Sequence, residues 1–255
     1  MIKNNILASI KHSTTPPAPV PVTDAGIYHD VVNWLISFST DWINWTTIAD
    51  KNLGATVVYN DWDTYDETNC WCFYQRWNNY GFPYAWNVTT DTAQVDASTY
   101  GPWNYYSNNV FIVRGYSPYN WDNSGNNDLR WDLTDTYEAR RWPCPVWFHI
   151  PTADSIATIY DTKTAFNFTW EQVQTYFKMP AAWRRYSGSS NILDQWDYYY
   201  WSSSISNSWN PYILSVNNRL YSYNQSNWTS IRPFKNVPVT PDTSRTVLYQ
   251  PTAER

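Results

Sequence analysis

The chain has 255 residues, with 17 basic and 22 acidic side chains. This length allows one large domain with a sizeable core, or one domain with appendages. Because there is no basic run and no apolar run of the ~20 residues that a membrane span requires, we expect neither a nucleic-acid partner nor membrane insertion.

The first 24 residues are expected to lie outside the packed domain as a head or linker. Residues 14–23, TTPPAPVPVT, form a Pro-rich stretch that favours an extended linker. The residues before them include lysines but no apolar h-region, so we expect no standard secretory signal. A fragment of a longer surface protein and a virion component that needs no signal both stay open. The predicted location is therefore a cell surface or a virion.

A hairpin is predicted early in the domain, over residues 34–48. LISFS alternates apolar and polar side chains, Asp41-Trp42 forms the turn, and INWTTI returns. A tryptophan is unusual at such a turn, where Asp-Gly is preferred because glycine adopts a positive φ without a Cβ penalty.

Two regular helices are predicted in the middle of the chain. Thr152 is a suitable N-cap for a helix over 153–165, which carries apolar side chains at helical spacing. Thr169 and Gln172 form a capping box that opens a second helix over 170–178. The remaining chain consists of short strands and long polar loops, so the predicted fold class is α+β.

The stretch from Tyr198 to Lys235 predicts short strands joined by polar turns. Strands are expected at 200–204, 211–216 and 230–234, with 219–223 leading out of a tight turn at Asn217-Asn218. Polar side chains and tyrosines fill the connections, a composition typical of a binding surface, although a plain polar hairpin is the alternative. The residues predicted to contact a ligand are Tyr186, Asn191, Tyr198, Ser206, Asn207, Asn210, Tyr212, Asn218, Tyr221, Tyr223, Asn224 and Asn227.

Several sequence motifs together resemble a known family. They are IADKNLGAT (48–56), NNYGFPY (78–84), YGPWNYY (100–106), PCPVWFHIPT (143–152), YYYWSSS (198–204), a YxLxV strand (212–216) and SIRPFKN (230–236). They resemble bacterial C-type-lectin-like domains of the Fibrobacter major paralogous domain group, related to the formylglycine-generating-enzyme-like branch. The resemblance implies a C-type-lectin-like domain over 25–236, with two helices, short twisted antiparallel strands and long loops. Residues 237–255 are then a Pro-rich tail, a linker or the first strand of a following unit.

The resemblance implies binding rather than catalysis. Some such domains are targets of diversity-generating retroelements, in which a reverse transcriptase changes adenine-containing codons near the C-terminus. Asn, Ser, Tyr and Asp, which such codons yield, dominate residues 186–227. The framework residues would be Trp201, Ser202, Leu214, Val216, Ile231 and Arg232. We expect a receptor-binding or adhesion protein with a protein or glycan partner; the alternative is a structural surface module without a specific ligand.

An enzyme of the cysteine-oxidising type is a third, disfavoured reading. That branch uses cysteines late in the fold, and here no cysteine follows Cys144. Cys70 and Cys72 are too close together for the usual zinc pair. A disulfide from either of them to Cys144 stays open, but buried free thiols are favoured. No Ser/His/Asp set can be assembled, and His149 is expected to make a structural hydrogen bond.

No cofactor is expected. Two oxygen-rich loops carry candidate Ca²⁺ ligands, but neither has the full calcium-loop signature, and solvated turns are favoured. The candidates are Asp61, Asp63, Asp66 and Glu67 in the first loop, and Asp122, Asn123, Asn126, Asn127 and Asp128 in the second.

Tryptophan and glycine have unusual abundances, at 18 and 7 residues. Average glycine usage of about 7% would give roughly 18 glycines in a chain of this length. Many tryptophans stand in turns where the family motifs usually hold glycine, so we predict UGA codons that the source organism reads as glycine. A carbohydrate-stacking, Trp-rich surface is the alternative. The positions in question are Trp34, Trp42, Trp62, Trp71, Trp77, Trp86, Trp103, Trp131, Trp142, Trp147, Trp183, Trp196, Trp209 and Trp228. Those where a tryptophan is expected are Trp45, Trp121, Trp170 and Trp201.

Overall fold

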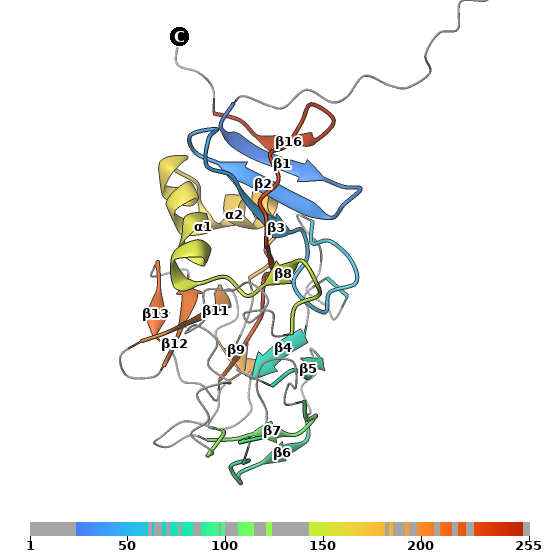
Figure 1. Ribbon diagram of the computed structural model, residues 1–255, viewed down its shortest axis with the longest axis vertical. Helices are drawn as coiled ribbons and strands as arrows, with labels where there is room; N and C mark the ends of the chain where they lie inside the picture. Colours follow the sequence, from blue (N-terminus) through green and yellow to red (C-terminus); the bar gives the residue numbers. More distant parts are fainter. Residues whose placement is uncertain are drawn as a thin grey trace, which may run out of the picture.

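The computed structural model describes most of the chain, in segments. These are residues 24–60, 63, 68–69, 72–75, 78–83, 88–96, 98–99, 107–114, 121–123, 143–181, 184–185, 192–193, 198–206, 210–215, 219–222 and 227–251. The predicted head, residues 1–23, lies outside them. The described residues form two helices and four sheets, so the expected α+β class is confirmed (Figure 1).

The largest sheet has six antiparallel strands at one end of the molecule. Its order is β16 (Thr246–Tyr249), β1 (Gly26–Asp30), β2 (Leu35–Ser39), β3 (Thr46–Ala49), β15 (Phe234–Lys235) and β8 (Phe148–His149). The predicted hairpin is therefore present as β2 and β3. The expectation that 237–255 lies outside the domain is wrong, because β16 pairs with β1 through Ile27↔Tyr249 and Tyr28↔Val247.

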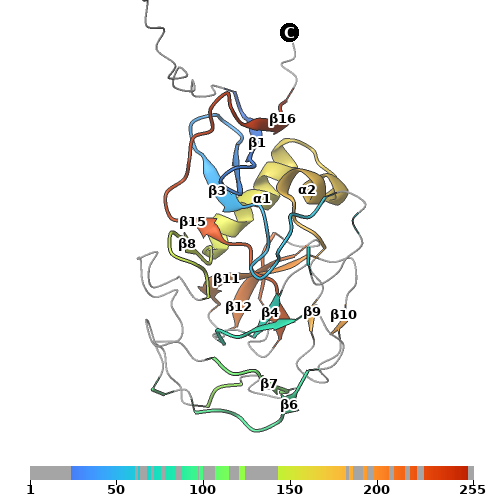
Figure 2. The ribbon, with the colours of Figure 1, turned by 90° about the vertical axis from the view of Figure 1, so that its right-hand side faces the viewer.

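Three smaller sheets complete the molecule below the largest one (Figure 2). A five-stranded sheet has the order β10 (Ile192–Leu193), β9 (Arg184–Arg185), β14 (Trp228–Thr229), β4 (Cys72–Gln75) and β5 (Gly81–Pro83). A three-stranded sheet has the order β11 (Tyr199–Ile205), β12 (Pro211–Ser215) and β13 (Tyr221–Ser222). Strands β6 (Thr90–Asp91) and β7 (Phe111–Ile112) pair in parallel at the far end.

Both helices begin where the sequence predicts. Helix α1 spans Ala153–Ala165, and Thr152 Oγ1 accepts a hydrogen bond from Ser155 N. Helix α2 spans Trp170–Phe177, with the Thr169–Gln172 capping box formed in both directions. It ends one residue earlier than expected, because Lys178 adopts a left-handed conformation with φ 51°.

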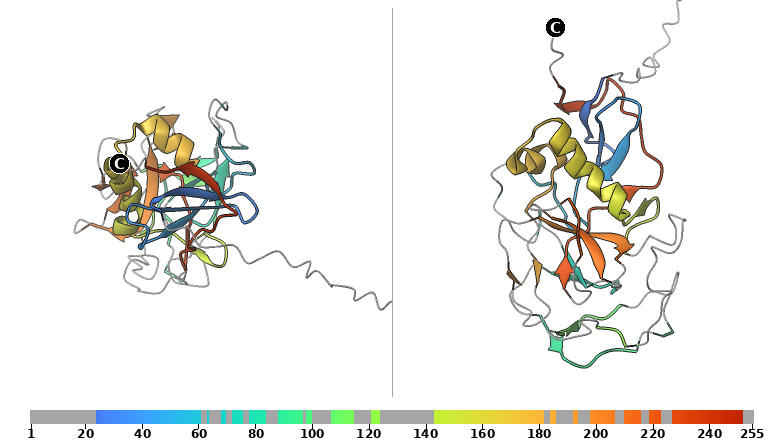
Figure 3. Two further views of the ribbon diagram at one scale, coloured as in Figure 1. Left: turned by 90° about the horizontal axis from the view of Figure 1, so that it is seen from above. Right: turned by 90° about the vertical axis from the view of Figure 1, so that its left-hand side faces the viewer.

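The main core lies between the helices and the largest sheet. Ile36 and Phe38 of β2 pack with Ile156 of α1 and Phe177 of α2, and all four are buried. The rings of Phe38 and Phe177 meet edge to face at 4.9 Å, a favourable arrangement. The three-stranded sheet lies below α1 (Figure 3, right), so the helix connects it to the rest of the molecule.

The predicted closing strand at 230–234 is wrong. Residues 230–233 instead connect β14, which ends at Thr229, to β15, which begins at Phe234, and these two strands belong to different sheets. Pro233 has no N–H to donate to a strand partner, and it interrupts regular pairing. Instead, Ile231 O accepts from Leu53 N and Pro233 O accepts from Ala49 N, so the segment crosses from one sheet to the next.

Candidate functional site

Strand β11 is anchored on three sides by buried groups. Trp201 is fully buried, and its Nε1 donates to Tyr74 O at 2.9 Å. Ser202 Oγ donates to Tyr212 O on the neighbouring strand. Ser203 N donates to Pro151 O, and Ser204 Oγ accepts from Ala153 N at the start of α1. Trp201 therefore fixes the strand against β4, and the run of serines after it fixes the strand against β12 and the start of α1.

Arg232 supports this framework from inside the molecule. Its side chain is fully buried, with Nη1 donating to Ala49 O at 2.8 Å and Nη2 to Lys178 O at 2.6 Å. Burial lowers the pKa of the guanidinium, and the neighbouring Tyr200 and Asp50 act in the opposite direction. Arg232 thus holds β3, the end of α2 and the segment before β15 together. The framework residues Ser202, Leu214 and Ile231 are also fully buried, while Val216 lies outside the described residues.

Polar side chains and tyrosines stand at the open end of the three-stranded sheet. The described members of this group are Ser206, Asn210, Tyr212, Tyr221 and Ser222, which we call the hairpin surface. Ser206 N donates to Asn210 O at 2.7 Å and so closes the β11–β12 turn. Ser222 Oγ donates to Ser206 Oγ at 3.1 Å, which brings β13 to the same turn. Tyr221 is 48% exposed, and the other four members are half-buried.

The hairpin surface has two faces. In the β12–β13 pair, Tyr212 lies opposite Ser222, and Ile213 lies opposite Tyr221. Directly opposed residues point to the same face of an antiparallel sheet, and successive residues point to opposite faces. Tyr212, Ser222 and Ser206 therefore form one group, and Tyr221 stands on the other face. Sequence reasoning missed Ser222, although its place across the predicted hairpin from Tyr212 could have indicated it.

The structure removes two predicted ligand-contacting residues from the surface. Tyr198 is 2% exposed; its hydroxyl donates to Trp170 O, and its ring packs on Trp170 at 4.9 Å. Asn227 is 1% exposed. Both side chains belong to the interior, because their neighbours cover them. The remaining predicted contacts lie outside the described residues: Tyr186, Asn191, Asn207, Asn218, Tyr223 and Asn224.

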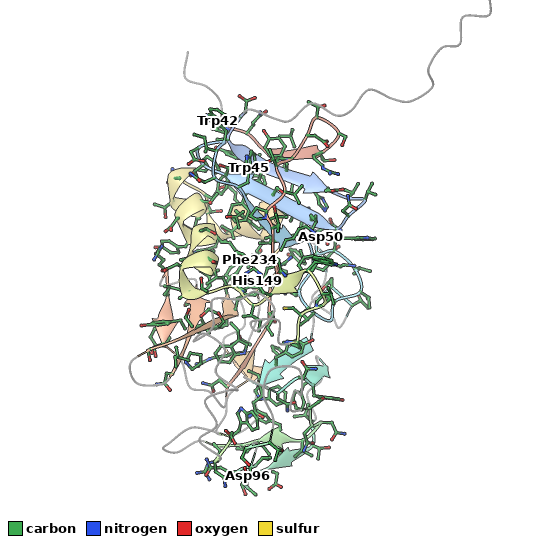
Figure 4. All side chains as sticks on the ribbon, in the orientation of Figure 1. Trp42, Trp45, Asp50, Asp96, His149 and Phe234 are labelled. Atoms are coloured by element: carbon green, nitrogen blue, oxygen red, sulfur yellow. The ribbon has the colours of Figure 1, made fainter. Side chains whose placement is uncertain are left out.

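The two described histidines are held by structural contacts. His149 Nδ1 and Asn236 Oδ1 lie 3.0 Å apart, so the predicted structural hydrogen bond is confirmed. His29 Nε2 lies 2.9 Å from Asp50 Oδ2, in a second buried pair. Figure 4 shows His149 and Asp50 in the middle of the molecule, far from the end that carries Asp96.

Cys144 is a free, buried thiol, as the sequence favoured. Burial raises its pKa above the ordinary value, so the thiolate that would act as a nucleophile is scarce at neutral pH. Among the residues that the structure describes, no three His, Cys, Asp or Glu side chains lie close enough to hold a metal ion. Most of the candidate Ca²⁺ ligands, including Asp61, Asp66, Glu67 and Asp128, lie outside that part of the chain.

None of the described helices is long and apolar enough to cross a membrane. Comparison with family models, with curated proteins and with solved structures finds no match to this chain.

Proposed function

We propose that this protein is a non-enzymatic binding protein with a C-type-lectin-like fold, whose hairpin surface contacts a protein or glycan ligand. Two helices, short antiparallel strands and long connections agree with that fold. The buried thiol and the histidines bonded inside the molecule support a binding role over a catalytic one.

The division between a buried framework and a partly exposed tip carries this proposal. Trp201, Leu214 and Arg232 are fully buried, whereas Asn210, Tyr212 and their neighbours at the tip reach solvent. Side chains at the tip can change without loss of core packing, because the strands beneath them are fixed by other residues. A variable ligand-binding surface requires this separation, and tyrosine with small polar residues suits it.

The proposal extends to diversification by a retroelement, which predicts a genomic signature. A near-copy of the codons for about residues 186–234 should lie downstream of the gene, beside a reverse transcriptase gene. Independent copies of the gene should then differ at Asn210, Tyr212 and Tyr221 and agree at Trp201 and Arg232. Identical tips in independent copies, with no second repeat nearby, would favour the structural-module alternative.

A binding experiment tests the surface itself. The wild-type chain is screened on printed glycans and on immobilised surface proteins, beside the triple variant Ser206→Ala, Asn210→Ala, Tyr212→Ala and the single variant Tyr221→Ala. We expect the triple variant to lose at least about tenfold in affinity, equivalent to about 1.4 kcal/mol, with unchanged circular dichroism. Tyr221→Ala reports whether the opposite face takes part. Binding that survives both changes would move the site elsewhere.

A further inference from the structure

Three tryptophans have a backbone conformation that suits glycine. Among the described residues, the non-glycine residues with positive φ are Trp34 (61°), Trp42 (57°), Trp147 (74°), Asn167 (53°) and Lys178 (51°). Asparagine is enriched in this left-handed region, but for a bulky residue it is an outlier, because Cβ approaches the following carbonyl oxygen. Chance does not readily place three of five such residues at tryptophan.

The turn at Trp147 shows most directly which residue it requires. Phe148 N donates to Pro145 O at 3.1 Å, so Pro145 to Phe148 form a β-turn with Trp147 at its third position. Trp147 has φ 74° and Val146 is not among the residues with positive φ, which is the pattern of a type II turn. Type II turns require glycine or asparagine there. Trp147 also presents a ring that is 69% exposed.

The turns at Trp34 and Trp42 are built by other side chains. Asp30 Oδ1 accepts from Val32 N and Asn33 N, just before Trp34. Asp41 Oδ1 accepts in the same way from the two residues after Trp42, at 3.0 and 2.8 Å. These carboxylates fix the backbone of the two turns, and each turn holds its tryptophan in a left-handed conformation. Both rings are 53% exposed; that of Trp34 lies 4.1 Å from Lys51 Nζ, and that of Trp42 stands at the tip of the molecule (Figure 4).

The tryptophans at the expected positions behave differently. Trp121 and Trp201 are fully buried. Trp170 packs on Tyr198 at 4.9 Å, and Trp45 donates from Nε1 to Trp42 O and meets the ring of Tyr28. None of these four described residues has a positive φ. Burial and specific contacts therefore mark these four, whereas left-handed backbone with an exposed side chain marks Trp34, Trp42 and Trp147.

Trp228 is the remaining described tryptophan in question, and its surroundings are overfilled. It is fully buried in β14, with its ring centroid 3.8 Å from that of Phe82 and 3.7 Å from that of Phe111. Ordinary aromatic pairs keep their centroids about 4.5–7 Å apart. A smaller residue at position 228 would relieve this crowding.

We infer that positions 34, 42 and 147 are glycine in the native protein, encoded by UGA codons that the source organism reads as glycine. Some bacterial lineages read UGA as glycine and others as tryptophan. Translating a gene with the wrong one of these codes therefore writes tryptophan at every UGA-encoded glycine of the chain. The chain has 18 tryptophans and 7 glycines, and an excess of tryptophan with a deficit of glycine is what this exchange produces. The inference is independent of the proposed ligand surface, because none of the three positions belongs to it.

The gene and the native protein provide the direct test. We expect UGA at codons 34, 42 and 147 and UGG at codons 45, 121, 170 and 201. Peptide mass spectrometry of the protein from its source should show glycine masses at the first three positions. UGG at those codons, or tryptophan masses in those peptides, would overturn the inference and favour a carbohydrate-stacking role for the exposed rings.

Recombinant variants test the physical basis independently. Trp42→Gly and Trp147→Gly remove left-handed strain and an exposed ring, so each should raise Tm by about 2–4 °C. Trp34→Gly should give a smaller rise, because it also removes the Lys51 contact. The matched controls Trp45→Gly and Trp201→Gly should lower Tm. Equal losses of Tm in the two groups would contradict the inference.

Discussion

The strands β1–β2–β3 and the strands β11–β12–β13 form two antiparallel meanders with different tips. The turns of the first meander expose apolar side chains: Val32, Trp34, Trp42 and Ile43 are 77%, 53%, 53% and 65% exposed. The turn of the second presents Ser206 and Asn210, with Ser222 beside them. Turns normally carry small polar residues and glycine, so the second meander is ordinary and the first is not.

This difference separates scaffold from surface. In both meanders the central strand is largely covered, since every residue of β2 is buried and only Tyr212 of β12 is half-buried. Change without loss of stability is therefore confined to the tips in both. With glycine at positions 34 and 42, the tips of the first meander lose their two largest exposed rings. Of the two meanders, the second would then be the one that displays aromatic and polar side chains together.

The largest expected effect follows from truncating the framework of the second meander. Trp201→Ala leaves a cavity and removes the hydrogen bond from Nε1 to Tyr74 O, and should cost about 3–5 kcal/mol of unfolding free energy. Denaturant unfolding measures it, with Tyr221→Ala as the control at an exposed position of the same sheet. A loss at Trp201 no larger than the loss at Tyr221 would mean that this meander lacks the rigid framework that the proposed surface needs.

Asp30 should have the next largest effect, in the first meander. It is 6% exposed, accepts from Val32 N and Asn33 N, and forms an ion pair with Arg245, which precedes β16. Asp30→Ala should cost about 1–3 kcal/mol, because the Val32 and Asn33 N–H groups and the largely covered Arg245 side chain lose the carboxylate that they share. Asp41→Ala is the matched control, because Asp41 accepts similar backbone hydrogen bonds in an exposed turn. Comparing the thermal unfolding of the two variants separates the effect of burial and of Arg245 from the effect of the turn hydrogen bonds. Equal effects of the two changes would show that burial and Arg245 add nothing.

The sequence predicts features that depend on neighbouring residues better than the pairing of segments far apart in the chain. The LISFS alternation, the Thr152 N-cap and the Thr169–Gln172 box depend on neighbouring residues, and all three are confirmed. The pairing of β16 with β1 joins Val247 to Tyr28 across nearly the whole chain, and no local pattern indicates such a partner. The prediction that Tyr198 is exposed at the ligand surface is wrong for the same reason. Tyr198 is polar and aromatic like its neighbours, and only the position of Trp170 reveals that it points inward.

The contribution of Asp41 to the stability of the first meander should depend on pH. Hydrogen bonds from the backbone and side chain of Asn44, together with those from Ile43 and Ser39, hold the pKa of this carboxyl well below its ordinary value of 3.8. Because the folded-state pKa is depressed, the carboxylate stabilises the fold above the unfolded-state pKa, and this contribution is lost as pH falls below it. The Tm difference between wild type and Asp41→Ala should therefore be constant near neutral pH and shrink below about pH 4. If this Tm difference did not change with pH, the charge of the Asp41 carboxylate would be excluded as its cause.

The smallest expected effect concerns the ion pair between the second meander and α1. Arg219 Nε and Nη2 donate to the two carboxylate oxygens of Asp161 at 2.7 and 2.8 Å, but the side chains are 45% and 50% exposed. Solvent and salt screen such a pair, so a double-mutant cycle with Arg219→Ala and Asp161→Ala should give a coupling of about 0.2–1 kcal/mol that falls with added salt. The meander is held to α1 instead by the hydrogen bonds of Ser203 and Ser204 with Pro151 and Ala153. A coupling well above that range, and insensitive to salt, would show that the ion pair fixes the orientation of the hairpin surface.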